Sequence, residues 1–145
     1  MSTPTNSAAT FADSLKTRFA LITAGAEYNY TYANLVYVNH AAALDEGVNI
    51  KKGEEEKLFE DSSKTYHYCR APIEIDVVTK NGSKNPDLVV ADLLKSIASN
   101  LSFSNTAINT NYLNTISDVP DQEGNLIAHR RIQIEVIFRK NAWSV

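Results

Sequence analysis

The segment HRRIQIEVIFRKN, residues 129–141, constrains the fold of this chain more than any other stretch. Its side chains alternate between two kinds. The apolar set is Ile132, Ile134, Val136 and Phe138, and the polar set is Arg131, Gln133, Glu135 and Arg139. Because successive side chains of a strand point to opposite faces, this alternation predicts a β-strand with one buried face and one charged face. The chain must therefore supply a core to cover the apolar side.

A second segment repeats the same alternation and leads into a helix. Ile73, Ile75 and Val77 alternate with Glu74 and Asp76, which predicts a second half-buried strand, and KNGSKN then breaks it. Asn85 as N-cap, followed by Pro86 and Asp87, is a strong signal for the start of a helix. The apolar stripe of this helix is predicted to be Val90, Leu94, Ile97 and Leu101, with Leu93 beside it.

An earlier helix is predicted near the N-terminus. Residues 1–9 are small and polar, so we expect a flexible segment there. Thr10 with Asp13 resembles a capping arrangement, and Gly25 is a plausible stop, so the helix is expected over about residues 11–24. Its apolar face is Phe11, Leu15, Phe19 and Ile22.

The segment after this helix is rich in tyrosine. Tyr28, Tyr30 and Tyr32 alternate with polar residues before the apolar run from Leu35 to Val38, which predicts one strand or two short ones. Stacking of nucleic-acid bases on these rings is disfavoured, because no basic residue between Tyr28 and Tyr37 would hold a phosphate. We expect the tyrosines to pack across strands instead.

Residues 45–64 are dense in charge of both signs and contain two glycines. This composition predicts a long, mobile charged loop. Ile50, Leu58 and Phe59 would be unusual in a purely solvent-facing loop, so part of it is expected to dock on something.

The last strand has a partner earlier in the chain. Ile108, Thr110, Tyr112 and Ile116 share the parity of one face, and a turn-rich linker over residues 117–125 is too short for a crossover helix. We therefore expect an antiparallel hairpin. The order of elements predicts an α+β fold: one domain over residues 1–145, with a mainly antiparallel sheet and two α-helices packed on one face.

The composition excludes several classes. The 145 residues carry a net charge of −3 with no basic block, which disfavours tight nucleic-acid binding. The single cysteine, Cys69, forbids an internal disulfide and suits a reducing cytosol. We expect no secretion signal in MSTPTNSAAT and no membrane association, because no apolar run approaches about 20 residues.

Few residues suggest chemistry. His40, His67 and His129 lie far apart, and one cysteine cannot build a zinc site. Cys69 and His67 would point the same way on a strand, which allows a thiol–imidazole pair, but a structural cysteine is favoured because no third orienting group accompanies them. We therefore expect no catalytic, cofactor-binding or metal-binding residues and no enzyme activity.

A binding or structural role remains. A charged sheet face meets a partner through charge pairs that set register more than affinity, and Trp side chains are enriched where interfaces bury an anchor. The residues predicted to form an interface are Glu74, Asp76, Leu58, Phe59, Arg131, Gln133, Glu135, Arg139 and Trp143. Burial of Trp143 on its own core is the equal alternative.

The layout resembles a known family. An N-terminal helix, a charged segment, the strand IEIDVVTKNG, the helix NPDLVVADLLKSIASNL, the linker VPDQEGN and the closing strand RRIQIEVIFRKN resemble the tail terminator (tail completion) proteins of tailed bacteriophages. The resemblance covers about residues 10–141 and rests on element order and strand texture.

The resemblance implies a structural protein of the virion, assembled in the host cytoplasm. Copies of the chain, commonly six, would form a ring that caps the tail tube and joins it to the head connector, with DNA passing through the lumen unbound. Two alternatives stay open: another head-tail joining or tail-tube protein of a phage, and a small α+β enzyme or ligand-binding domain with a pocket built from Tyr28–Tyr37 and Cys69.

Overall fold

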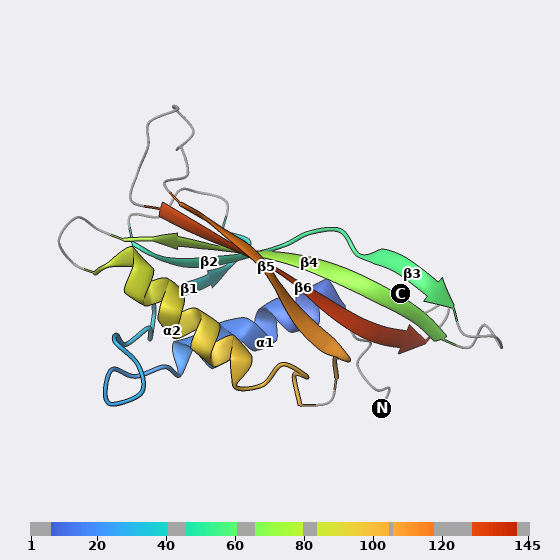
Figure 1. Ribbon diagram of the computed structural model, residues 1–145, viewed down its shortest axis with the longest axis horizontal. Helices are drawn as coiled ribbons and strands as arrows, with labels where there is room; N and C mark the ends of the chain where they lie inside the picture. The colour runs from blue at the N-terminus through green and yellow to red at the C-terminus, as the bar shows by residue number, and fades with distance from the viewer. Residues whose placement is uncertain are drawn as a thin grey trace.

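The computed structural model describes residues 7–40, 46–60, 66–79, 84–104, 106–117 and 129–141. Two helices and six strands follow one another along the chain (Figure 1). They are α1 (Ala8–Ala20), β1 (Val36–Val38), β2 (Gly47–Lys52), β3 (Glu56–Glu60), β4 (Tyr66–Val78), α2 (Pro86–Ala98), β5 (Asn109–Ser117) and β6 (His129–Asn141).

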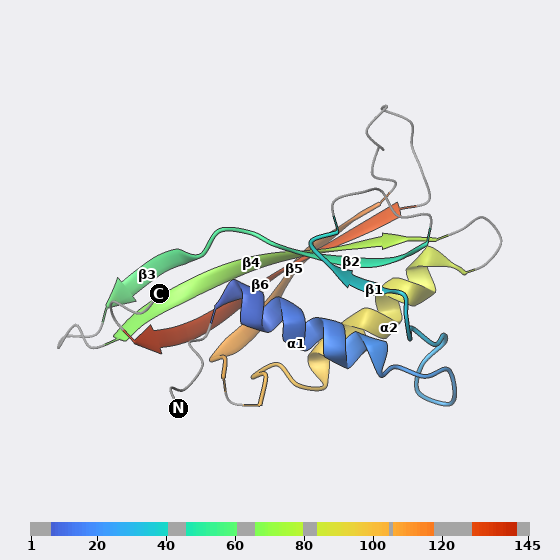
Figure 2. The same ribbon diagram turned by 180° about the vertical axis from the view of Figure 1, so that it is seen from behind.

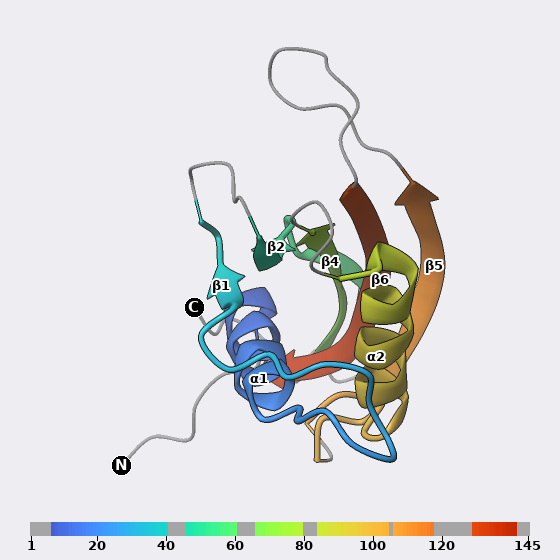
Figure 3. The ribbon, with the colours of Figure 1, turned by 90° about the vertical axis from the view of Figure 1, so that its left-hand side faces the viewer.

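The six strands form one sheet in the order β1-β2-β4-β6-β5, and β3 pairs with the remaining half of β4. Figure 3 views this order from one end of the strands. All pairs are antiparallel except β1–β2, which is parallel. The predicted α+β class with a mainly antiparallel sheet is therefore confirmed, as is the antiparallel pairing of β5 with β6. The parallel β1–β2 pair was not predicted.

Both helices lie on the same side of the sheet, as Figures 1 and 2 show from opposite directions. The apolar positions of β4 and β6 point toward the helices and are buried, as the alternation predicts. Phe11 of α1 links the layers, because its ring makes edge contacts with Phe103 at 5.0 Å and Phe138 of β6 at 5.1 Å. We call the opposite side of the sheet, which carries Glu74, Arg131 and their neighbours, the outer face.

Helix α1 begins and ends earlier than predicted. Ser7, not Thr10, is the N-cap, and its hydroxyl accepts a hydrogen bond from the Thr10 N–H at 3.2 Å. Both residues are good caps, so the sequence pattern alone could not choose between them. The helix ends at Ala20 with Leu21 as its C-cap, well before Gly25. Residues 7–9 of the predicted flexible segment belong to this helix start, and residues 1–6 lie outside the described residues.

Helix α2 starts as predicted, with Asn85 as N-cap and Pro86 in the first turn. Its buried face agrees with the predicted stripe only in part: Ile97 and the flanking Leu93 are buried, and Val90 and Leu94 are partly buried against the core. The buried residues are Val89, Asp92, Leu93, Ser96 and Ile97, while Leu101 lies beyond the helix and is exposed. A hydrophobic pattern cannot anticipate that a carboxylate and a hydroxyl occupy the core side.

The tyrosine segment is not the predicted strand pair. Only Val36–Val38 is a strand, and residues 28–32 are an irregular loop held by Asp92 of α2. The Asp92 carboxylate accepts hydrogen bonds from the Asn29 N–H at 2.9 Å, the Tyr30 N–H at 3.2 Å and the Tyr32 hydroxyl at 2.8 Å. These bonds replace a strand ladder for this stretch of backbone.

The predicted charged loop over residues 45–64 is wrong for the part that the structure describes. Residues 47–52 and 56–60 are strands β2 and β3, which pair with successive halves of β4. The chain passes between them at Gly53, whose N–H donates to the Pro72 carbonyl at 2.8 Å. A Cβ on Gly53 would lie 2.8 Å from Pro72 Cγ, so only glycine fits without a shift. Glu56 and Lys57 belong to β3, which is an edge strand in the described residues, where charged side chains are common, whereas β2 lies between β1 and β4.

The face prediction for the penultimate strand is also wrong. A bulge between Tyr112 and Asn114 shifts the register of β5 against β6. Thr110 pairs with Val136 on the helix side, whereas Ile116 pairs with Arg131 on the outer face. One extra residue in a strand reverses the parity of all that follow.

Candidate interaction surface

The outer face brings together five of the predicted interface residues. The β4–β6 register sets Asp76 opposite Arg131, Glu74 opposite Gln133 and Pro72 opposite Glu135. Their side chains interact across the strands, with 2.9 Å between Arg131 Nε and Asp76 Oδ1 and 3.3 Å between Gln133 Nε2 and Glu74 Oε1. Residues about 55–60 positions apart in sequence therefore form one polar ladder.

Asp76 is the most buried member of this ladder, with only 4% of its surface exposed. Lys51 Nζ of β2 lies 2.8 Å from its Oδ2, Arg131 contacts Oδ1, and His129 Nε2 lies 3.6 Å from Oδ1. Burial alone raises the pKa of the Asp76 carboxyl, but the neighbouring His129, Lys51 and Arg131 outweigh it and hold that pKa well below its usual range. The carboxylate is therefore charged and compensated inside the subunit.

Glu135 is compensated in the same way. Arg70 Nη1 of β4 lies 3.4 Å from Glu135 Oε2, and the Asn111 side-chain amide donates to Glu135 Oε1 at 3.1 Å. The second terminal nitrogen of Arg70, Nη2, pairs with Glu56 of β3. These contacts show that the outer face satisfies its own charges; whether it also contacts a neighbouring subunit stays a prediction.

The remaining predicted residues lie apart from this ladder. Leu58 and Phe59 are on β3, 43% and 57% exposed, and the Phe59 ring stacks on Tyr68 with centroids 4.5 Å apart. The Arg139 guanidinium lies over the Tyr66 ring, 4.0 Å from its centroid. β3 and the adjoining ends of β4 and β6 thus form an aromatic and cationic patch at one end of the sheet. Trp143 lies outside the described residues.

Strand β5 carries a surface that the sequence-based reasoning missed. Its apolar exposed side chains, with that of the residue before it, are Ile108 at 56%, Tyr112 at 54%, Leu113 at 50% and Ile116 at 41%. Within the described residues β5 pairs only with β6, so its other edge is open. The signal was present in the sequence, because NTNYLNTIS contains no charged residue and no Pro, which protect many natural edge strands; the bulge after Tyr112 is the one such device that β5 carries.

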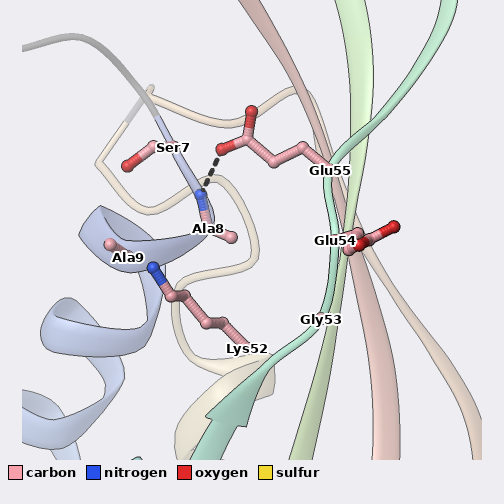
Figure 4. A pocket seen from close by; sticks show the side chains of 7 residues that line it. All are labelled: Ser7, Ala8, Ala9, Lys52, Gly53, Glu54 and Glu55. Carbon is pink, nitrogen blue, oxygen red and sulfur yellow. Dashed lines mark hydrogen bonds between the residues drawn. The ribbon is translucent and has the colours of Figure 1, made fainter. Parts of the chain in front are cut away.

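Two hollows flank the edge formed by β2 and β3. One, of about 520 Å³, lies between the start of α1 and the β2–β3 connection (Figure 4). There Glu55 Oε1 accepts a hydrogen bond from the Ala8 N–H at 2.7 Å, while Lys140 Nζ lies 3.1 Å from its Oε2. Glu55 thus compensates the positive end of the α1 dipole and the Lys140 charge, which is a structural role.

The second hollow, of about 500 Å³, lies on the outer face and is lined by residues of β2, β4, β5 and β6. Its walls include Lys51, Gly53, Pro72 and Leu113. It opens where the chain departs from the regular ladder at Gly53, and it connects the outer face to the apolar surface of β5.

Cys69 is a buried thiol on β4. Its side chain is buried, and burial raises the pKa of the thiol above its ordinary value, which keeps it protonated. Cys69 pairs with Phe138 and Lys57 across its strands, whereas Tyr30 and Tyr32 contact α2. Across the described ranges, no group of three or more His, Cys, Asp or Glu side chains is placed to hold a metal ion.

Comparison with known proteins adds no relative. No protein-family model matches the sequence, and no curated protein is similar to it at a significant level. Neither helix of the described residues is long and apolar enough to cross a membrane.

Proposed function

We propose that this chain is a structural subunit of a phage virion, of the tail terminator kind, which assembles with copies of itself into a ring. One observation carries the proposal: apolar side chains are exposed at both opposite edges of one sheet, on β3 and on β5. Exposed apolar surface of this kind marks association sites. The similarity of element order to that family supplies the identity of the assembly.

The two edges favour a ring over a symmetric dimer. A two-fold interface uses the same patch on both subunits, whereas head-to-tail association joins two different patches and gives a ring when the rotation between subunits closes. β3 exposes Leu58 and Phe59, and β5 exposes Ile108, Tyr112, Leu113 and Ile116. Because these patches differ in sequence and lie on opposite edges, each subunit has one surface for each of two neighbours.

The outer face suits a lumen through which DNA passes. Among the described residues, the ion pairs and ring contacts of this face involve the cations Lys51, Arg70, Arg131 and Arg139 and the anions Glu56, Glu74, Asp76 and Glu135. Contacts with phosphate depend on cations that displace counterions. Because most of these cations pair with carboxylates of the same face, few of them remain to hold phosphate, so DNA would slide along it.

The partners in this proposal are the same chain, commonly in six copies, the tail tube protein and the head connector or adaptor proteins. The virion tail is the proposed location. Another head-tail joining or tail-tube protein would also form a ring. The effect of the ring on the length of the tail tube separates these possibilities.

The experiment has two readouts. Size-exclusion chromatography with light scattering and negative-stain images are expected to show a uniform ring, and addition of the ring to polymerising tail tube protein is expected to fix tube length. A chain that stays monomeric at high concentration and leaves tube growth unchanged would contradict the proposal. A ring that leaves tube growth unchanged would favour another neck or tube component.

A further inference from the structure

We propose that strand β5 of one copy pairs with strand β3 of the next, so that the sheet continues between subunits; this rests on the proposed self-assembly. β5 is the stronger half of the argument. It is nine residues long, uncharged throughout, and open along one edge within the described part of the chain. A long edge strand without charge or Pro is a template for pairing with another strand.

The side chains of β5 expose apolar groups on both of its faces. The bulge after Tyr112 sets Thr110 and Tyr112 on the helix side, opposite Val136 and Ile134, and sets Ile116 on the outer side, opposite Arg131. Leu113 lines the hollow on the outer face. Because apolar groups are exposed on both faces of β5, a strand added at its edge can contact both sets. A partner that packs on one face would contact only one set.

The neighbour's β3 fits this edge in chemistry. Within the described residues β3 pairs only with β4, so its other edge is open. Its Leu58 and Phe59 side chains are exposed, and Phe59 already stacks on Tyr68, which makes a continuous apolar surface. Because β5 is uncharged, the charges of β3 meet no like charge in such a pair.

Strand direction also fits. β3 is antiparallel to β4, β4 to β6, and β6 to β5. After these three reversals β3 and β5 of one subunit run in opposite directions. A rotation that continues the sheet preserves strand direction, so β5 and the neighbour's β3 would pair antiparallel, like most of the sheet.

The offset between the two strands matches a closed ring. Through β6, β5 lies level with residues 70–77 of β4, whereas β3 lies level with residues 67–70. Their centres differ by about five residues, or about 17 Å, across four strands that span about 19 Å. If the centre of β5 pairs with the centre of the neighbour's β3, the strands tilt by about 40° to the ring axis. This tilt lies within the roughly 35–45° of closed sheets.

The test is site-directed cross-linking. Asn114→Cys in β5 and Glu56→Cys in β3 place both thiols on the outer face, because their strand partners are Gln133 and Arg70. The two variants are made singly and together, and treated with a short bifunctional maleimide. The double variant and an equimolar mixture of the single variants are expected to give covalent dimers, and the double variant also higher multimers. The wild-type protein, treated in the same way, is the control for reaction of Cys69, which is buried.

A second pair of variants tests the edge itself. Leu113→Lys with Ile116→Lys adds the charges that edge strands normally carry, and is expected to abolish the oligomer while circular dichroism stays unchanged. Leu88→Lys on α2 is the matched control, because Leu88 is as exposed as Ile116, and should still assemble.

The outcomes separate the two proposals. Cross-linking of Asn114→Cys to itself would show that β5 pairs with β5 and would overturn the inference. A ring that forms without any β3–β5 cross-link, or that survives both lysines, would overturn the inference and leave the ring proposal standing. A wild-type chain that is monomeric at every concentration would overturn both.

Discussion

Arg131 Nε donates a hydrogen bond of 2.9 Å to Asp76 Oδ1, and this pair anchors the outer face of the sheet. The two residues are directly opposite in the β4–β6 register, and Lys51 completes the site from β2 at 2.8 Å. The charge alternation that first suggested an interface is thus largely used within the subunit. A substitution of Arg131 or Asp76 therefore affects the stability of the subunit itself, so it cannot test assembly alone.

Asp76→Asn is expected to destabilise the subunit by about 2 kcal/mol near neutral pH, because it leaves two cations beside a buried neutral amide. Urea denaturation measures the difference. Glu74→Gln is the matched control on the same strand face; its side chain is 40% exposed, so a change within about 0.5 kcal/mol is expected. Equal losses for both variants would contradict the central role of Asp76.

The pH dependence of that difference has a defined sign. The pKa of Asp76 is lower in the folded state than in the unfolded chain, so its stabilisation is present above the unfolded pKa of about 3.9 and is lost as the pH falls through the folded-state pKa. The gap between wild type and Asp76→Asn should be constant between about pH 5 and pH 7 and shrink below about pH 4. A gap that widens in acid would refute this linkage.

Arg139→Glu is expected to weaken assembly while leaving the fold intact, because Arg139 is exposed and its guanidinium contacts Tyr66 at the surface. Arg131→Glu is not an equivalent probe. It places a third carboxylate beside Glu74 and Asp76, and so should destabilise the subunit itself. Light scattering and thermal melts of the two variants distinguish these effects; loss of the fold in Arg139→Glu would argue against the prediction.

Tyr32→Phe is expected to cost about 1–2 kcal/mol, because it removes one donor from the buried Asp92 carboxylate while three other donor groups remain. Tyr37→Phe is the control: its hydroxyl is 3.5 Å from the Asn34 carbonyl oxygen, and its removal should cost little. Denaturant midpoints report both. Burial of Tyr32 and its contact with Asp92 also raise the pKa of its hydroxyl, so this tyrosine should not ionise before the protein unfolds in alkali.

Gly53→Ala is expected to destabilise the chain by about 1–2 kcal/mol, since the new methyl group would press on the Pro72 ring and carbonyl and push the β2–β3 edge away from β4. Gly25→Ala provides the control, because nothing lies within 4 Å of the Cβ it would gain. Unfolding curves of the two variants give the comparison, and equal stability would show that the edge adjusts without cost.

Cys69 should resist thiol reagents in the folded protein. Its side chain is buried and its pKa is raised by burial, so little thiolate is accessible near neutral pH. Labelling by iodoacetamide should become fast only in denaturant. Fast labelling of the folded chain would favour the enzyme alternative. Unimpaired assembly of a Cys69→Ser variant would then argue against it.

The sequence by itself determined the elements whose signals are local. The alternation in β4 and β6 predicted two half-buried strands, and Asn85 with Pro86 predicted the start of α2. Such patterns are read within one strand or one helix, because each side chain's direction follows from backbone periodicity. The α+β class followed from the order of these elements.

Only the tertiary structure decided the rest. The charged stretch became strands β2 and β3 because the long strand β4 offers an edge for its backbone hydrogen bonds. The tyrosine segment became a loop because a buried carboxylate on α2, 60 or more residues away, satisfies its donors. The exposed surface of β5 depends on one bulge and on an open sheet edge, and both are properties of strand pairing rather than of composition.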